Sequence, residues 1–307
     1  MFRVKNNGVE GRFSVCGGMV ECSMTKKKKK NSVNPGRPSD VQIVTPSKAL
    51  KAVVRLLEEI DDEAHDAARR SFPGEYSPLF NFDQGVLERG INTLKSVRLL
   101  VEHGHWEMAH SLLRQLLELL ANMEFLAQMP DRTKATIQYV NYGLLQKTTE
   151  QILTMKYDEE SGRPIDQERL AKLEAFQQGP TFDEFKANTK DGSLKFVDSW
   201  CRKKMKSLCE ASANKLRLSQ YELLYSPWSE QVHAAPGALI DSMFRNQGTD
   251  WQKLVIEEDE VRIHEAVSMA ITLFLELRRF LPAIDAPDPE KANDWLEGAK
   301  PKQPAAA

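Results

Sequence analysis

Apolar residues recur at intervals of three and four along most of this chain, which is the spacing of one face of an α-helix. The first such stretch follows the cap-type residues Pro46 and Ser47, and its apolar positions are Leu50, Val53, Val54, Leu57 and Ile60. The last one runs from 257 to 281. No segment alternates apolar and polar residues as a half-buried strand does. The pattern predicts an all-α protein folded as a multi-helix bundle.

The segment 105–128 is the most apolar of these predicted helices. Its wide apolar face is centred on Leu112, Leu116, Leu119, Leu120 and Met123. Arg114 and Glu118 stand on the opposite face beside Ala121 and Phe125, whereas an exposed helix face is normally more polar. We therefore expect this helix to be central in the bundle, with Arg114 and Glu118 at least partly buried against a neighbour.

The helical pattern begins and ends inside the chain, which sets the domain boundaries. We predict one helical bundle domain over residues 46–282, in which Asp83 caps a second helix that ends at Gly104. Within this domain, residues 158–193 form a broken excursion with a turn and a Gly-Pro break. Residues 283–307 are predicted to be a disordered tail.

Residues 1–45 are predicted to be a disordered, Lys-rich tail. The sequence around Met24, which precedes the run Lys26 to Lys30, resembles a natural bacterial start. Residues 1–23 lack helical periodicity, and their pattern is unlike that of the rest of the chain. We expect translation to begin at Met24 rather than at Met1.

The composition excludes several classes of function. A net charge of −2 over 307 residues and a pI near 6.4 give the chain as a whole no nucleic-acid or membrane footprint. No run of about 18 apolar residues indicates a membrane span. Phosphate-binding loops, dinucleotide-binding glycines, GxSxG and HExxH motifs are absent from the sequence. We expect a cytoplasmic protein without a cofactor and without membrane association.

A metal site is the first chemistry to weigh, because His103, His105 and His110 lie close together in sequence. A di-metal helix bundle repeats the motif Glu-x-x-His, and only Glu107 with His110 matches it here. We therefore predict no metal site and interpret these histidines as surface residues at a turn.

The segment from Tyr221 to Pro236 is the strongest candidate for chemistry. Ser229 and His233 are four residues apart, hence on one helix face, and Tyr225 lies one further turn before them. Histidine titrates near neutral pH and is a frequent general acid or base. The same residues also fit a hydrogen-bonded polar cluster that only sets the register between helices.

A second candidate is a basic group after Trp200, made of Arg202, Lys203, Lys204 and Lys206. Clustered cations of this kind contact the phosphates of RNA. They are equally typical of a solvated helix face, so both interpretations remain open.

Two spaced motifs carry a resemblance to a family. They are Ala109, Leu112, Leu113, Arg114 and Glu118, followed by Tyr221, Tyr225, Ser229 and His233. In this order they resemble the bacterial domain of unknown function family 5677 over about residues 47–281. The resemblance implies an all-helical fold and no particular activity.

A more distant similarity is to the HEPN superfamily, helical bundles that include RNA-cutting toxins and phage-defence proteins. Their hallmark is an Arg followed four to six residues later by a His on one helix. The sequence departs from it, because the nearest Arg before His233 is Arg217. Arg114, on another helix, would have to supply the guanidinium.

Two functional hypotheses follow. The first is a non-enzymatic binding or dimerisation module with a buried polar cluster, for which a homodimer and RNA are candidate partners. The alternative is a HEPN-like, metal-independent RNase in a toxin or phage-defence role. In that case His233 would move protons, Arg114 would bind phosphate, and Glu118, Ser229 and Tyr225 would orient them.

Overall fold

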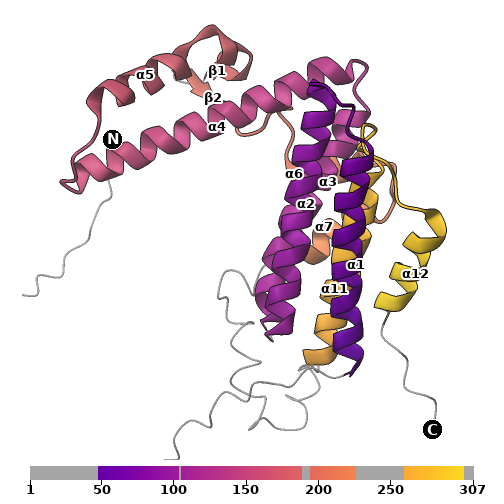
Figure 1. The fold of residues 1–307 in the computed structure, drawn as a ribbon. Helices are drawn as coiled ribbons and strands as arrows, with labels where there is room; N and C mark the ends of the chain where they lie inside the picture. The colour runs from indigo at the N-terminus through magenta and orange to yellow at the C-terminus, as the bar shows by residue number, and fades with distance from the viewer. Residues whose placement is uncertain (1–47, 104, 189–193, 226–258, 301–307) are drawn as a thin grey trace, which may run out of the picture. The chain divides into compact units, whose positions relative to one another are not determined.

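The computed structural model describes residues 48–103, 105–188, 194–225 and 259–300, and helices dominate these ranges (Figure 1). The elements are α1 (Lys48–Arg70), α2 (Pro78–Glu102), α3 (Trp106–Ala127), α4 (Arg132–Glu160), α5 (Gln167–Gln178), η1 (Pro180–Phe185), β1 (Lys186–Asn188), β2 (Leu194–Phe196), α6 (Met205–Glu210), α7 (Arg217–Tyr225), α11 (Asp259–Arg278) and α12 (Pro289–Ala299). The predicted all-α bundle is confirmed. The predicted tail 1–45, with its start at Met24, lies outside the described residues.

Four long helices, α1, α2, α3 and α11, pack side by side and enclose the main core (Figure 1). Their inward positions are filled by aliphatic and aromatic side chains that are fully buried, such as Ile60, Leu94, Leu116 and Phe274. Helix α3 contacts α2, α4, α6, α7 and α11, so the expectation that this apolar helix is central is confirmed. Residues on both faces of α3 pack against other helices, which is why α3 carries so few exposed polar positions.

Helix α2 begins earlier than the sequence suggested. The side chain of Ser77 accepts a hydrogen bond from the backbone N–H of Phe80, and Pro78 occupies the first helical turn. A Ser cap followed by Pro is a stronger start signal than Asp83 five residues later. Asp83 is instead completely buried, where it accepts hydrogen bonds from Arg132 and from the backbone N–H of Ala283.

Residues 158–188 of the predicted excursion 158–193 hold the end of α4, then α5, η1 and β1. Helix α5 and the 3-10 helix η1 pack on α4, and Leu145, Phe182 and Phe185 form a small core between them. The short strands β1 and β2 form an antiparallel hairpin in the register Lys186↔Phe196. The sequence had not predicted these strands, because three residues are too few to show a period of two.

The segment after the hairpin does not form the solvated helix face that one interpretation of the basic group assumed. Trp200 and Arg202 lie in a turn, in which Arg202 has a positive φ of 57°, and helix α6 starts only at Met205. Apolar residues are sparse between 198 and 204, so no amphipathic face holds a helix there.

Residues 289–299 correct the prediction of a disordered tail beyond 282. They form α12, in which Asp288 caps the first turn, and α12 packs on α1 and α11. Trp295 is 2% exposed, and Ser268 of α11 donates a hydrogen bond to the carbonyl oxygen of Ala299. One buried Trp in a short helix is enough to dock this segment, although its composition resembles that of a disordered chain.

Two glycines of α2 offer a matched test of this packing. A Cβ on Gly90 would lie 2.9 Å from a ring carbon of Phe274, whereas a Cβ on Gly85 would meet nothing within 4 Å. We expect Gly85→Ala to raise the free energy of unfolding by about 0.5–1 kcal/mol through helix propensity. We expect Gly90→Ala to lower it by about 1–3 kcal/mol, because the core there is already full. Urea unfolding measures both, and a Gly90→Ala variant as stable as Gly85→Ala would contradict the packing of α2 on α11.

Candidate functional site

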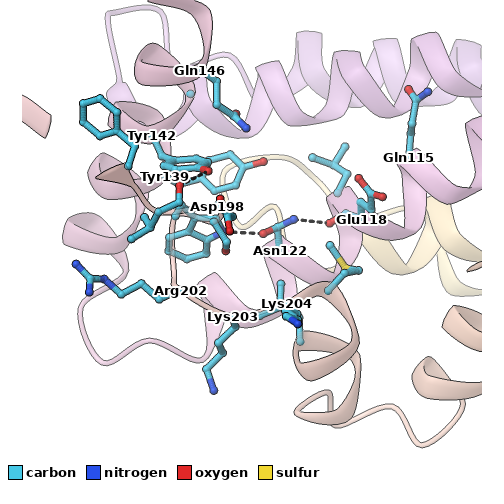
Figure 2. Close-up of a pocket in the computed structure, with 18 of the residues that line it drawn as sticks. Gln115, Glu118, Asn122, Tyr139, Tyr142, Gln146, Asp198, Arg202, Lys203 and Lys204 are labelled. Carbon is cyan, nitrogen blue, oxygen red and sulfur yellow. Dashed lines mark hydrogen bonds between the residues drawn. The ribbon is translucent and has the colours of Figure 1, made fainter. Parts of the chain in front are cut away.

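A cleft of about 1170 Å³ opens between α3, α4, the β-hairpin and the segment 196–205 (Figure 2). Glu118 and Asn122 reach it from α3, and Tyr139 and Tyr142 reach it from α4. Tyr225, the last residue of α7, lies at its wall. The cleft therefore brings together elements that are far apart in the sequence.

Three of the residues singled out from the sequence meet at this wall. The Tyr225 hydroxyl donates a hydrogen bond to the Glu118 carboxylate, and Arg114 Nε lies 3.6 Å from the same carboxylate oxygen. The Arg114 guanidinium sits 3.8 Å from the centre of the Tyr225 ring, a cation–π arrangement. The side chains of Arg114 and Glu118 are 30% and 42% exposed. The cluster is thus internally paired and still open to solvent.

The environment of Glu118 changes its acidity. Burial raises the pKa of the Glu118 carboxyl above its ordinary value of 4.5, although the charge of Arg114 opposes the shift. Burial, assisted by the charge of Glu118, also raises the pKa of the Tyr139 hydroxyl. The cluster combines a carboxyl group that protonates more easily than usual with a guanidinium and a phenol, groups that accept, donate and neutralise charge at a bound ligand.

A chain of hydrogen bonds supports the floor of the cleft (Figure 2). The indole N–H of Trp200 donates to Asn122 Oδ1 at 2.6 Å, and Asn122 Nδ2 donates to the backbone carbonyl of Glu118 at 2.7 Å. The Trp200 ring packs edge-on against Tyr139, with 5.4 Å between ring centres. Because these groups satisfy each other, they form a fixed surface for a ligand.

The predicted basic group divides at the cleft. Arg202, Lys203 and Lys204 line it, while Lys206 does not. Arg202 donates hydrogen bonds to the backbone carbonyls of Glu184 and Lys186, and the Lys203 ammonium lies 5.3 Å from the centre of the Phe125 ring. The backbone carbonyls and the Phe125 ring carry no net charge, so Arg202 and Lys203 keep their positive charge available at the mouth of the cleft.

A buried ion pair positions α7 and hence Tyr225. Arg217 is 1% exposed and donates two hydrogen bonds to Glu124 of α3, at 2.8 and 2.9 Å, and one to Glu276 of α11, at 2.6 Å. Burial alone would lower the pKa of Arg217, but these carboxylates outweigh it and raise that pKa. Tyr225 follows eight residues later, about 12 Å along the helix.

Two predicted site residues, Ser229 and His233, lie outside the described residues. Their association with Arg114 stays a prediction.

Within the described residues, no group of three or more His, Cys, Asp or Glu side chains is arranged to hold a metal ion. His110 packs against Trp106 in the bundle and is 2% exposed, unlike the surface histidine that the sequence suggested.

Several residues of the site were not found from the sequence. Asn122, Tyr139 and Trp200 carry no motif, and their spacing in the chain gives no sign that they share one cleft. The pairing of Arg217 with Glu124 had a weak signal, since each charge interrupts an otherwise apolar helix face.

None of the described helices is long and apolar enough to cross a membrane.

The raised pKa of Glu118 predicts a pH-dependent stability. Its protonation favours the folded state, so this contribution is complete below pH 4.5 and is lost as pH rises through the raised pKa. Glu118→Gln removes the titration. We therefore expect the free energy of unfolding of the variant, minus that of the natural protein, to increase between about pH 4 and pH 7. Urea unfolding across this range measures it, and a difference that stays constant or falls would contradict the assignment.

Comparisons with known proteins identify the family. Residues 85–250, just over half of the chain, match the family described as Family of unknown function (DUF5677). A search of curated proteins found no match, and neither did a search of solved structures. The matched range contains α3, α4, the hairpin and α7, which are the elements that build the cleft. The chain belongs to this family of unknown function, DUF5677.

Proposed function

We propose that this protein is a binding module whose cleft holds an anionic ligand. The observation that carries the proposal is the charge of the cleft. Among the described residues that line it, five are basic and two are acidic: Arg89, Lys195, Arg202, Lys203 and Lys204 against Glu118 and Asp198. The whole chain has a net charge of −2, so this surface is opposite in sign to the protein average.

The pairing of these charges strengthens the argument. Glu118 is paired with Arg114, and Asp198 lies 3.6 Å from Lys195. The remaining four cations make no ion pair with a carboxylate within the described ranges. Arg89 donates to the neutral side chain of Gln115, and Arg202 donates to backbone carbonyls. Cations gathered at a cleft without carboxylate partners attract an anionic ligand, and attract it less at high salt.

A polyanion that has neither nucleobases nor peptide bonds tests anion binding separately from the recognition of RNA or a peptide. Binding of a fluorescein-labelled heparin oligosaccharide to the full chain is measured by anisotropy. We expect the double variant Lys203→Glu, Lys204→Glu to weaken binding at least tenfold in 50 mM salt, because two cations of the cleft become anions.

The control for that assay is Lys134→Glu with Lys172→Glu, which makes the same change in net charge on exposed residues outside the cleft. It corrects for the change in net charge, and we expect it to weaken binding by less than threefold. Equal losses in the two double variants would overturn the proposal, because the attraction would then be a property of net charge.

A second candidate function, a metal-independent RNase, is favoured by the cluster at the wall of the cleft. Arg114, Glu118 and Tyr225 are held together and remain partly exposed, as groups that act on a phosphodiester must be. His233 would serve as acid or base, and RNA would be the ligand. A defence role, a cytoplasmic location and a homodimer stay predictions that accompany these hypotheses.

Cleavage of total bacterial RNA by the purified protein in EDTA tests the second candidate. If it is correct, the natural protein cuts RNA, and both His233→Ala and Arg114→Ala reduce cutting at least a hundredfold. Arg69→Ala, at an exposed position on α1, serves as the control and should cut normally. Absence of cutting by the natural protein, or cutting that both variants retain, would reject the RNase.

A further inference from the structure

The cleft continues into a second hollow along α4. This hollow has a volume of about 600 Å³ and shares five lining residues with the cleft, Tyr142, Gln146, Phe196, Val197 and Asp198. Together they form one groove along α4, which runs from Tyr139 to Thr154. At about 1.5 Å per residue this part of α4 is about 22 Å long, which an extended chain of six or seven residues spans.

The two parts of the groove differ in chemistry. The first part contains the cations Arg202, Lys203 and Lys204. The second part contains no Lys or Arg among its described lining residues, and its walls include Leu145 and Leu153. Leu153 is 62% exposed, so its side chain is accessible to a ligand in the groove.

The lack of cations among the described lining residues of the second part decides between two kinds of anionic chain. Glu150 and Asp198 line it, and both are exposed. Each lies within 3.6 Å of a lysine, Lys147 or Lys195, so neither carboxylate is an unopposed charge. A nucleic acid carries a phosphate at every unit, so a strand along the whole groove would leave its phosphates in the second part without a cation among the described lining residues. A peptide can place acidic residues over the cations and apolar residues over the exposed Leu153, so the peptide and the groove complement each other.

We propose that the groove binds an extended acidic peptide segment of a partner protein, with an apolar anchor beside the acidic residues. This inference rests on the proposed function and names the partner's chemistry. In the complex that we propose, the acidic residues of the peptide lie near Lys203 and Lys204, and its apolar anchor lies against Leu153. The salt-sensitive and the apolar contributions to binding then come from separate ends of the groove.

Labelled peptides test the proposal by anisotropy on the full chain. The composite peptide has four acidic residues, a Gly-Ser spacer and Leu-Phe-Leu, and it is made in both orders because the structure does not favour one direction. Peptides with only the acidic half or only the apolar half, and a mixed-sequence single-stranded RNA of twelve nucleotides, are compared with it. We expect one order of the composite to bind at least tenfold tighter than either half and tighter than the RNA.

Variants separate the two ends of the groove. Leu153→Glu should weaken the composite at least fivefold and leave the acidic half unchanged, while Lys203→Glu with Lys204→Glu should weaken both. Leu99→Glu is the matched control, because Leu99 is 50% exposed on α2 and lies outside the groove. Melting temperatures confirm that each variant is folded.

Each outcome has one meaning. A composite no tighter than its acidic half, or indifferent to Leu153→Glu, overturns the apolar anchor. RNA that binds tenfold tighter than the composite overturns the peptide and leaves the anion-binding cleft standing. If the heparin oligosaccharide also fails to bind, the proposed function itself is wrong.

Discussion

The wall of the cleft depends on the buried cation Arg217, held between Glu124 and Glu276. A charge out of water is costly unless its partners are in place, so the guanidinium is stable only where α3, α7 and α11 meet in this arrangement. The position of α7 follows from that requirement. Tyr225, two turns further along α7, then lies over Arg114 and against Glu118. The ion pair thus links the interior of the bundle to the wall of the cleft, because the helix that it anchors is also the helix that completes the polar cluster.

The cleft itself combines a rigid floor with available charge. Asn122, Trp200 and Tyr139 satisfy one another, so their geometry does not depend on a ligand. The cations at the mouth bond to neutral partners or to aromatic rings, so their charge is not cancelled by neighbouring carboxylates within the described residues. A sealed cluster would serve only to set helix register, whereas here Glu118 is 42% exposed. This exposure supports the proposed binding role over a purely structural one.

Sequence and structure agree where local physics dominates and differ where long-range contacts decide. The centrality of α3 was predictable, because apolar residues surround it and charged ones are few. The role of Asp83 was not, since its partners Arg132 and Ala283 are distant in the chain. Helix α12 was missed because composition averages over a segment, while Trp295 and Ala299 are buried against the bundle and dock it. The turn at Trp200 was missed because one aromatic residue does not reveal which partner holds it.

By itself, the sequence determined the all-α class, the long helices that make the bundle and the position of Arg114 and Glu118 on one helix face, since hydrophobic period and local spacing specify these. The cleft was decided by the tertiary structure alone. Its residues come from α2, α3, α4, the hairpin and α7, and their approach depends on packing and on buried ion pairs between segments far apart in the chain. No spacing along the chain encodes such distances, because side chains become neighbours only after the helices pack. Charge was decided in part by each. Arg202, Lys203 and Lys204 are neighbours in the sequence, whereas only the fold brings Arg89 and Lys195 to the same cleft.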